Sequence, residues 1–257
     1  MWWLTQGSCA LPVFLVAWSS STFIVPYVIA LFRRDVDVLF PYISDTGANP
    51  PESCIFGLMT FVSACAGKRK ANENGPKKRK LHLRACVPVR AGMATVYSRF
   101  KFVEKLSEAA SARLNKTSLV LGMLACLGMC VVATFQETTV TAVHDIGALL
   151  FFVSGILYVL LQSVISYQAF PRSSSAAVCR ARLAVAVVAT LALFPTVICA
   201  FFVKQTDLHR DAGSKDYPFH MASAVCEWIV AFSFICFFLT YIDDFKLFTL
   251  RVKAELL

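Results

Sequence analysis

One acidic residue stands inside a long apolar stretch of this sequence. Glu227 lies about eight residues into the run 219–242, which is roughly 12 Å along the axis if that run is a helix. Ionisable groups inside a membrane-spanning helix are expensive to bury and commonly mark ion or substrate pathways. Glu227 is therefore the strongest single candidate for a functional side chain.

Three further ionisable residues could lie near Glu227. His220 precedes Glu227 by seven residues, which places both on one face of a helix, and His144 and Asp145 stand at the head of another apolar run. The four residues could form a polar cluster at one end of a helical bundle. We expect interhelical hydrogen bonds that lock the bundle. A proton or solute relay and a hydrolytic site are the two alternatives.

The sequence offers one partial match to a catalytic motif. Asp45-Thr46-Gly47 has the form of the aspartic-protease triplet, but such an enzyme needs two carboxyl groups that share a proton, and no second DTG occurs. There is no nucleophile elbow, HExxH motif, P-loop or CxxC pair either. We therefore expect a protein that is not an enzyme and has no catalytic, cofactor-binding or metal-binding residues.

The composition is typical of a membrane protein. Apolar residues make up 57% of the chain, the mean hydropathy is +0.63 and only 16% of the residues are charged, against about 25% in soluble domains. The run 143–167 is long enough to cross the ~30 Å hydrocarbon layer, which takes about 20 residues. We predict an all-α bundle of six spans in a single domain, residues 1–257. The predicted spans are about 11–32, 54–67 continued by 93–97, 118–135, 143–167, 183–202 and 219–242.

A basic insertion, residues 68–92, interrupts the second predicted span. It holds nine basic residues and one acidic residue, and so supplies +8 of the formal net charge of +9. Each Lys or Arg at the centre of a span costs about 2.5–3.5 kcal/mol, so nine of them do not stay in the membrane. We predict that residues 68–92 come from an aberrant or alternative transcript or from a gene-model error. A real insertion would emerge into the cytosol and shorten the second helix. Because the rest of the chain is nearly neutral, we expect membrane lipids as partners and no nucleic acid.

The segment FPYISDTG, followed by PPESCIFG, resembles the signature loop of the DNA-damage-regulated autophagy modulator (DRAM) family of six-span membrane proteins. The matching loop residues are Pro41, Tyr42, Ile43, Ser44, Asp45, Thr46 and Gly47. Further similar segments are LVLGMLACLGMCVVATFQ, VHDIG, LLQSVISY, KDY, SAVCEWIVAF, FFLTYIDDF and TLR. The resemblance runs from the first residues to about Arg251, interrupted at the insertion, and is strongest to the founding member, a p53-responsive lysosomal protein.

The resemblance implies a six-helix bundle in the lysosomal membrane that promotes autophagy, with links to apoptosis and with protein partners that the sequence does not identify. It also implies that both termini are cytosolic. The charge pattern agrees, because basic residues are in excess in the loops after the second and fourth spans and in the C-terminal tail. The PYISDTG segment would then face the lumen. The alternative function is lipid or solute handling that uses Glu227 and His144.

Overall fold

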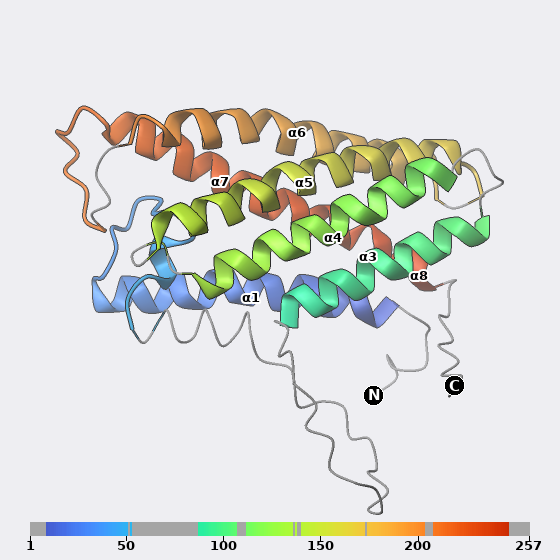
Figure 1. Cartoon of the computed structure of the whole chain (residues 1–257), viewed down its shortest axis with the longest axis horizontal. Helices are drawn as coiled ribbons and strands as arrows, with labels where there is room; N and C mark the ends of the chain where they lie inside the picture. The colour runs from blue at the N-terminus through green and yellow to red at the C-terminus, as the bar shows by residue number, and fades with distance from the viewer. Residues whose placement is uncertain are drawn as a thin grey trace, which may run out of the picture.

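The structure is a computed structural model of the chain. It describes residues 9–50, 52, 87–106, 112–135, 137, 140–172, 174–203 and 208–246. Within these ranges every regular element is a helix. The helices run side by side along the long axis of the molecule (Figure 1). They confirm the predicted all-α fold class, a polytopic helical membrane bundle.

The bundle consists of six long helices and two short ones in the described ranges. The long helices are α1 (Ala10–Arg33), α3 (Val87–Leu106), α4 (Ala112–Thr134), α5 (Thr141–Gln168), α6 (Ala176–Ala200) and α7 (Tyr217–Leu239). The short ones are a 3₁₀ turn, η3 (Asp45–Gly47), and α8 (Tyr241–Lys246), which follows α7 directly. In the part of the chain that the structure describes, five segments are long and apolar enough to cross a membrane: α1, α4, α5, α6 and the continuous stretch of α7 and α8.

Local sequence signals account for several helix boundaries. The Ser175 hydroxyl accepts a hydrogen bond from the Val178 N–H at 3.3 Å and so caps the start of α6. Pro218 stands in the first turn of α7, where a proline sacrifices no hydrogen bond. The chain leaves α1 at Arg34, which adopts a left-handed conformation with φ of 60°. Pro26 and Pro195 lie inside α1 and α6, as the apolar runs predict.

Helix α5 has more buried residues than any other helix in the described ranges. Its buried residues Phe152, Ile156 and Val159 belong to one cluster with Val230 and Phe237 of α7. The backbones of α4 and α5 come very close where Gly128 faces Gly147. A methyl group on Gly128 would lie 2.5 Å from Phe151 N and 2.7 Å from Gly147 O, so only glycine fits at this crossing.

The second predicted span lies largely outside the described residues. Residues 54–67, and residues 68–86 of the predicted insertion, are not described. Residues 87–92, which we assigned to the insertion, form the first turns of α3, and 93–97 continue that helix. The number of spans and the nature of the insertion therefore stay predictions.

The two ends of the bundle differ in the segments they carry (Figure 1). Helix α1 begins and α8 ends at one end, here called the terminal end. The other end, here called the loop end, carries residues 34–50, the turn between α4 and α5, and the segment before α7. The PYISDTG segment thus lies at the end of the bundle opposite the ends of the described chain. The side of the membrane that each end faces stays a prediction.

Candidate functional site: the PYISDTG loop on α7

The PYISDTG loop, residues 41–47, folds into a compact turn through its own polar groups. Phe40 introduces it with a left-handed φ of 41°, a conformation that costs a side-chain-bearing residue about 1–2 kcal/mol. The Tyr42 N–H donates to the Asp45 carboxyl at 3.3 Å, and the Thr46 hydroxyl donates to the Ile43 carbonyl at 2.6 Å. Asp45 and Thr46 are both buried. The DTG triplet therefore forms a turn in which the Asp45 carboxyl group accepts a hydrogen bond from the loop's own backbone.

Helix α7 holds this loop through two neighbouring side chains. The Ile43 N–H donates to Glu227 Oε2 at 3.0 Å, and Trp228 Nε1–H donates to the Pro41 carbonyl at 2.9 Å. Between these bonds the Ile43 side chain enters an apolar cluster with Ala231 of α7. The acidic residue that stands out in the sequence is thus the acceptor that fixes the loop, and both polar bonds go to backbone groups that would otherwise lack a partner.

His220 forms the neighbouring contact, two helical turns before Glu227 on the same face of α7. Its ring meets the Tyr42 ring edge to face, with the two centroids 4.8 Å apart and the planes at 87°. The His220 side chain is buried, and among the described residues neither of its ring nitrogens finds a hydrogen-bond partner. Its contact with the loop is therefore an aromatic one.

Acidic groups converge at the loop end of the bundle. The carboxyl group of Asp45 interacts electrostatically with Glu137, which follows α4, and with Glu227. Burial and the charge of Glu137 raise the pKa of Asp45 to about 7, although the Arg210 guanidinium and the Tyr42 N–H act in the opposite direction. Asp45 therefore titrates close to neutral pH.

A second set of contacts ties the segment before α7 to the segment after α1. Asp37 accepts from the Arg210 N–H at 2.8 Å and pairs with His209 at 3.1 Å. Burial alone would raise the pKa of Asp37, but these two partners outweigh it and lower the pKa. The Arg210 side chain also lies over the Tyr42 ring, 5.9 Å from its centroid. The PYISDTG loop is thus enclosed by α7 on one side and by residues 209–210 on another.

The four residues of the predicted polar cluster lie at this end but do not contact one another directly. His144 is buried and its Nδ1 lies 2.8 Å from the Phe135 carbonyl, which joins the start of α5 to the end of α4. Asp145 is exposed. No hydrogen bond or ion pair joins any two of His144, Asp145, His220 and Glu227, all of which are described. In this part of the chain Glu227 and His144 both bond to backbone groups.

The sequence analysis missed a buried ionic network at the terminal end. Arg99 of α3 and Arg182 of α6 both donate to the same oxygen of Asp244 in α8, each at 2.6 Å. The two arginine side chains are 0% exposed and the aspartate 3%, so the network holds two cations and one anion away from water. Three helices that are distant in sequence meet at a single carboxylate oxygen.

Neighbouring polar groups accept further hydrogen bonds from both guanidinium groups. Ser166 accepts from both arginines, at 3.3 Å from Arg99 and 2.9 Å from Arg182. The Arg99 Nε–H donates to Gln162 at 3.0 Å, and Arg182 also donates to the Thr240 carbonyl at 2.9 Å. The Tyr241 ring lies between the two cations, 4.9 and 5.1 Å from their central carbons. The network therefore fixes α3, α5, α6 and α8 in one arrangement.

A sequence signal for this network exists in hindsight. Arg99 is flanked by Val96, Phe102 and Val103, at the spacing of one buried helix face. A charge in the middle of a buried face needs a partner of opposite sign. The sequence alone does not show which of several acidic residues that partner is.

The described part of the chain shows no metal-binding constellation. No group of three or more His, Cys, Asp or Glu side chains in these residues is arranged to hold a metal ion. The loop end carries a folded loop with titratable carboxyl groups. The terminal end carries the buried ionic network that joins the helices.

These features define a multi-pass helical membrane protein with a structured loop docked at one end. The family model described as "Frag1/DRAM/Sfk1/Cwh43P N-terminal domain" matches residues 7–67 and 84–248. The chain belongs to this family. Residues 68–83, which the family model leaves unmatched, fall within the predicted insertion 68–92.

Curated relatives cover almost the whole chain. It is 42% identical over 254 residues to DNA damage-regulated autophagy modulator protein 1 of both Mus musculus and Homo sapiens, covering 98% of this chain and 96% of each relative. It is 38% identical over 266 residues to DNA damage-regulated autophagy modulator protein 2 of Mus musculus, covering 100% of this chain and 90% of that relative. No solved structure matches the chain.

Proposed function

We propose that this chain is a lysosomal membrane protein that promotes autophagy in a stress-linked or p53-linked response, without catalysing a reaction itself. The observation that carries the proposal is the 42% identity, over nearly the full length of both chains, to proteins named as DNA damage-regulated autophagy modulators. The PYISDTG loop docked on α7 supports it, because a structured loop is a surface that a partner can recognise.

In this proposal the terminal end of the bundle faces the cytosol and the loop end faces the lumen. Support comes from the basic residues of the connections at the terminal end, because basic residues are retained on the cytosolic side. The acidic groups Asp45 and Glu137 would then lie at the lumenal end of the bundle. Membrane lipids and a lysosomal or autophagy protein are the proposed partners.

The proposal is tested by expressing a fluorescently tagged copy in cells that lack the endogenous protein. We expect the copy to coincide with lysosomal markers and to raise autophagic flux, measured as turnover of an autophagosome marker with and without a lysosomal inhibitor. A copy without residues 68–83, the part of the insertion that the family model leaves unmatched, should do the same. Residence in another membrane, or unchanged flux at equal expression, would contradict the proposal.

A second candidate function is lipid or solute handling that uses Glu227 and His144. The observation that favours it is the convergence of Asp45, Glu137 and Glu227 at one end of a membrane bundle, since ionisable groups at such positions often serve transport. A Glu227→Gln variant separates the two candidates. Normal targeting and flux with an altered lumenal pH or lipid composition supports the second candidate, and unchanged pH and lipids reject it.

A further inference from the structure

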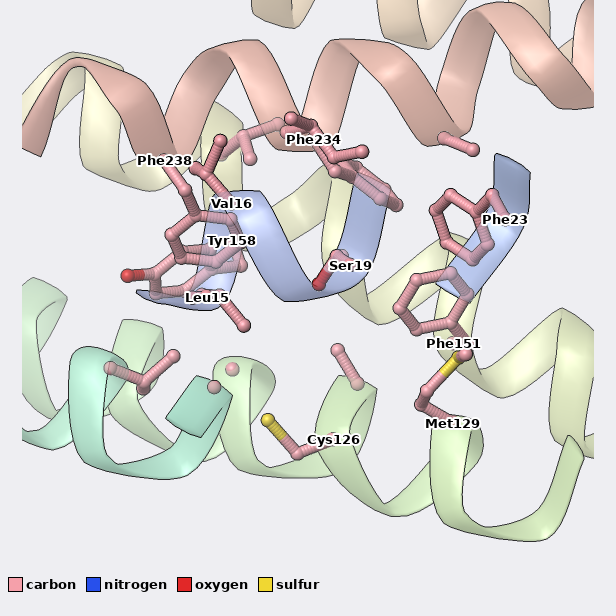
Figure 2. A pocket seen from close by; sticks show the side chains of 18 residues that line it. Leu15, Val16, Ser19, Phe23, Cys126, Met129, Phe151, Tyr158, Phe234 and Phe238 are labelled. Carbon is pink, nitrogen blue, oxygen red and sulfur yellow. The ribbon is translucent and has the colours of Figure 1, made fainter. Parts of the chain in front are cut away.

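An apolar pocket opens between helices in the middle of the bundle, apart from both polar sites described above. Side chains of α1, α3, α4, α5 and α7 line it, and its free volume is about 100 Å³ (Figure 2). This volume is below the roughly 300–1,000 Å³ that is usual for sites of drug-sized molecules, so the pocket suits a slender ligand or a part of one. Large apolar side chains form much of its wall: Leu15, Phe23, Met129, Phe151, Phe234 and Phe238.

The pocket is elongated along the helix axes. Its lining runs from Leu15 to Phe23 on α1 and from Phe151 to Val159 on α5, which corresponds to about 12 Å of helix in each case at 1.5 Å per residue. Both segments lie in the middle of their helices. Because α1 and α5 are long and apolar enough to cross a membrane, this slot lies at the depth of the hydrocarbon layer.

The lining offers almost nothing to a polar ligand. No charged residue contributes to it. The Tyr158 hydroxyl is already paired with the Tyr241 hydroxyl at 3.0 Å, which leaves the Ser19 hydroxyl and the Cys126 thiol as the remaining polar side-chain groups. An ion, an amino acid or a lipid headgroup would lose its hydration here without compensation. A hydrocarbon chain makes no hydrogen bonds with water and so would lose none on entering the pocket.

Glycine residues set the width of the slot. A methyl group on Gly155 would lie 2.7 Å from the Phe234 ring, which shows that this ring rests directly on the α5 backbone. A methyl group on Gly92 would lie 3.2 Å from the Cys126 sulfur, a tight contact with a single side-chain atom. The wall is thus closely packed around Phe234, and an added group on the α3 side would press against the Cys126 thiol.

We propose that this slot binds a segment of one acyl chain of a bilayer phospholipid. Its length along the helix axes, its depth in the membrane and its uncharged apolar lining all fit an extended methylene chain. A second copy of this protein would have to present a whole helix, whereas the slot lies among five helices of a single chain. The proposal goes beyond the proposed role in autophagy and holds or fails independently of it.

Photolabelling of the purified full-length chain tests this proposal. The protein is reconstituted in nanodiscs that contain phosphatidylcholine with a photoactivatable diazirine in its acyl chain, illuminated, digested and mapped by mass spectrometry. We expect concentrated labelling of peptides that carry pocket residues such as Met129 and Phe151. A Ser19→Phe variant should reduce that labelling several-fold, because Ser19 points toward the space (Figure 2) and a phenyl ring would fill it.

The matched control is Ser21→Phe, the same substitution two residues along α1 at a serine that does not line the pocket. It should leave the labelling unchanged. If Ser19→Phe does not give a monodisperse protein, Gly92→Val narrows the slot from α3 and should lower the labelling in the same way.

Three results would overturn the proposal. The first is labelling that is spread evenly over the bilayer-facing residues and does not respond to either pocket variant. The second is displacement of the acyl label by a sterol at low molar ratio, which would make a sterol the occupant. The third is a photochemical cross-link from benzoylphenylalanine at position 19 to residues 54–67, which the structure does not describe. That result would assign the slot to the chain's own segment.

Discussion

Glu227 accepts a hydrogen bond from the backbone N–H of Ile43 at 3.0 Å, across 184 positions of sequence. A carboxyl group inside a membrane helix needs a partner, and so does a loop amide that is withdrawn from water. The Ile43 amide supplies the donor that the Glu227 carboxyl group needs, and the carboxyl group supplies the acceptor that the amide needs. The bond explains why an acidic residue occurs within an apolar helix without requiring it to take part in a reaction.

Removing the hydrogen bond from Trp228 of α7 to the loop should weaken the attachment of the loop to that helix. A Trp228→Phe substitution loses the 2.9 Å bond to the Pro41 carbonyl but keeps an aromatic ring beside Tyr27 and Phe232. We expect the free energy of unfolding to fall by about 0.5–1.5 kcal/mol, the usual net value of one hydrogen bond. Thermal unfolding in detergent measures this change. Unaltered stability would show that the indole N–H contributes nothing to holding the loop.

The loop should be more stable in acid than at neutral pH. The pKa of Asp45 in the folded chain is about 7, against an ordinary value of 3.8, so between these values the folded state binds a proton that the unfolded state has released. The stabilising effect of protonated Asp45 is therefore present at low pH and is lost as pH rises from about 4 to about 7. The charged groups that face Asp45 are Glu137, Glu227 and Arg210.

Amide hydrogen exchange of the loop, corrected for the intrinsic pH dependence, tests this expectation in nanodiscs at about pH 5 and pH 7.5. Protection should be greater at the lower pH in the wild-type chain. In Asp45→Asn the difference should shrink, because the amide does not titrate. A pH difference of the same size in the variant would show that another group is responsible.

Asp244 should be the most sensitive position at the terminal end. Asp244→Asn leaves Arg99 and Arg182 buried without a counter-charge, and breaking a buried ion pair typically costs about 3–5 kcal/mol. We expect a large loss of thermal stability or of folded yield. Asp243→Asn is the matched control, since Asp243 is 75% exposed and pairs only with Lys246 at the surface. Equal stability of the two variants would contradict the network's proposed role.

The contact between α4 and α5 should not tolerate a larger residue at Gly128. A Gly128→Ala methyl would overlap Phe151 N and Gly147 O, both backbone atoms that move only if a helix moves. We expect destabilisation of about 1–3 kcal/mol, as for other overpacked cores. Gly213→Ala is the control, because its methyl would make only ordinary contact with Asp211 at 3.4 Å. Thermal unfolding of the two variants in parallel measures the difference.

The bundle was predictable because its signals are local. Uncharged runs of about 20 residues predict membrane helices whatever surrounds them, and α5 occupies the run 143–167 with one or two further residues at each end. The small residues Gly122, Ala125 and Gly128, spaced along one face of α4, are buried. The formation of membrane helices and the burial of small residues both follow from the local sequence.

The pairing of polar groups was only partly predictable, because it depends on which helices are neighbours. Glu227 was identified from the cost of its position, but its partner, a backbone amide in the PYISDTG loop, has no sequence signature. In the sequence, Arg99 is one of several basic residues after the second predicted span. Only the folded structure shows that it is buried against Asp244. Charge patterning reports which side of a membrane a segment faces and not which ions pair.

The central claim is that Glu227 holds the PYISDTG loop on α7, and the exchange rate of the Ile43 amide measures this most directly. In nanodiscs, Glu227→Ala should speed exchange of that amide several-fold, since one hydrogen bond contributes about 0.5–1.5 kcal/mol. Glu227→Gln keeps an acceptor oxygen and should retain most of the protection. If Ile43 exchanged at the wild-type rate in Glu227→Ala, the loop would be held by something else and the account of this site would be wrong.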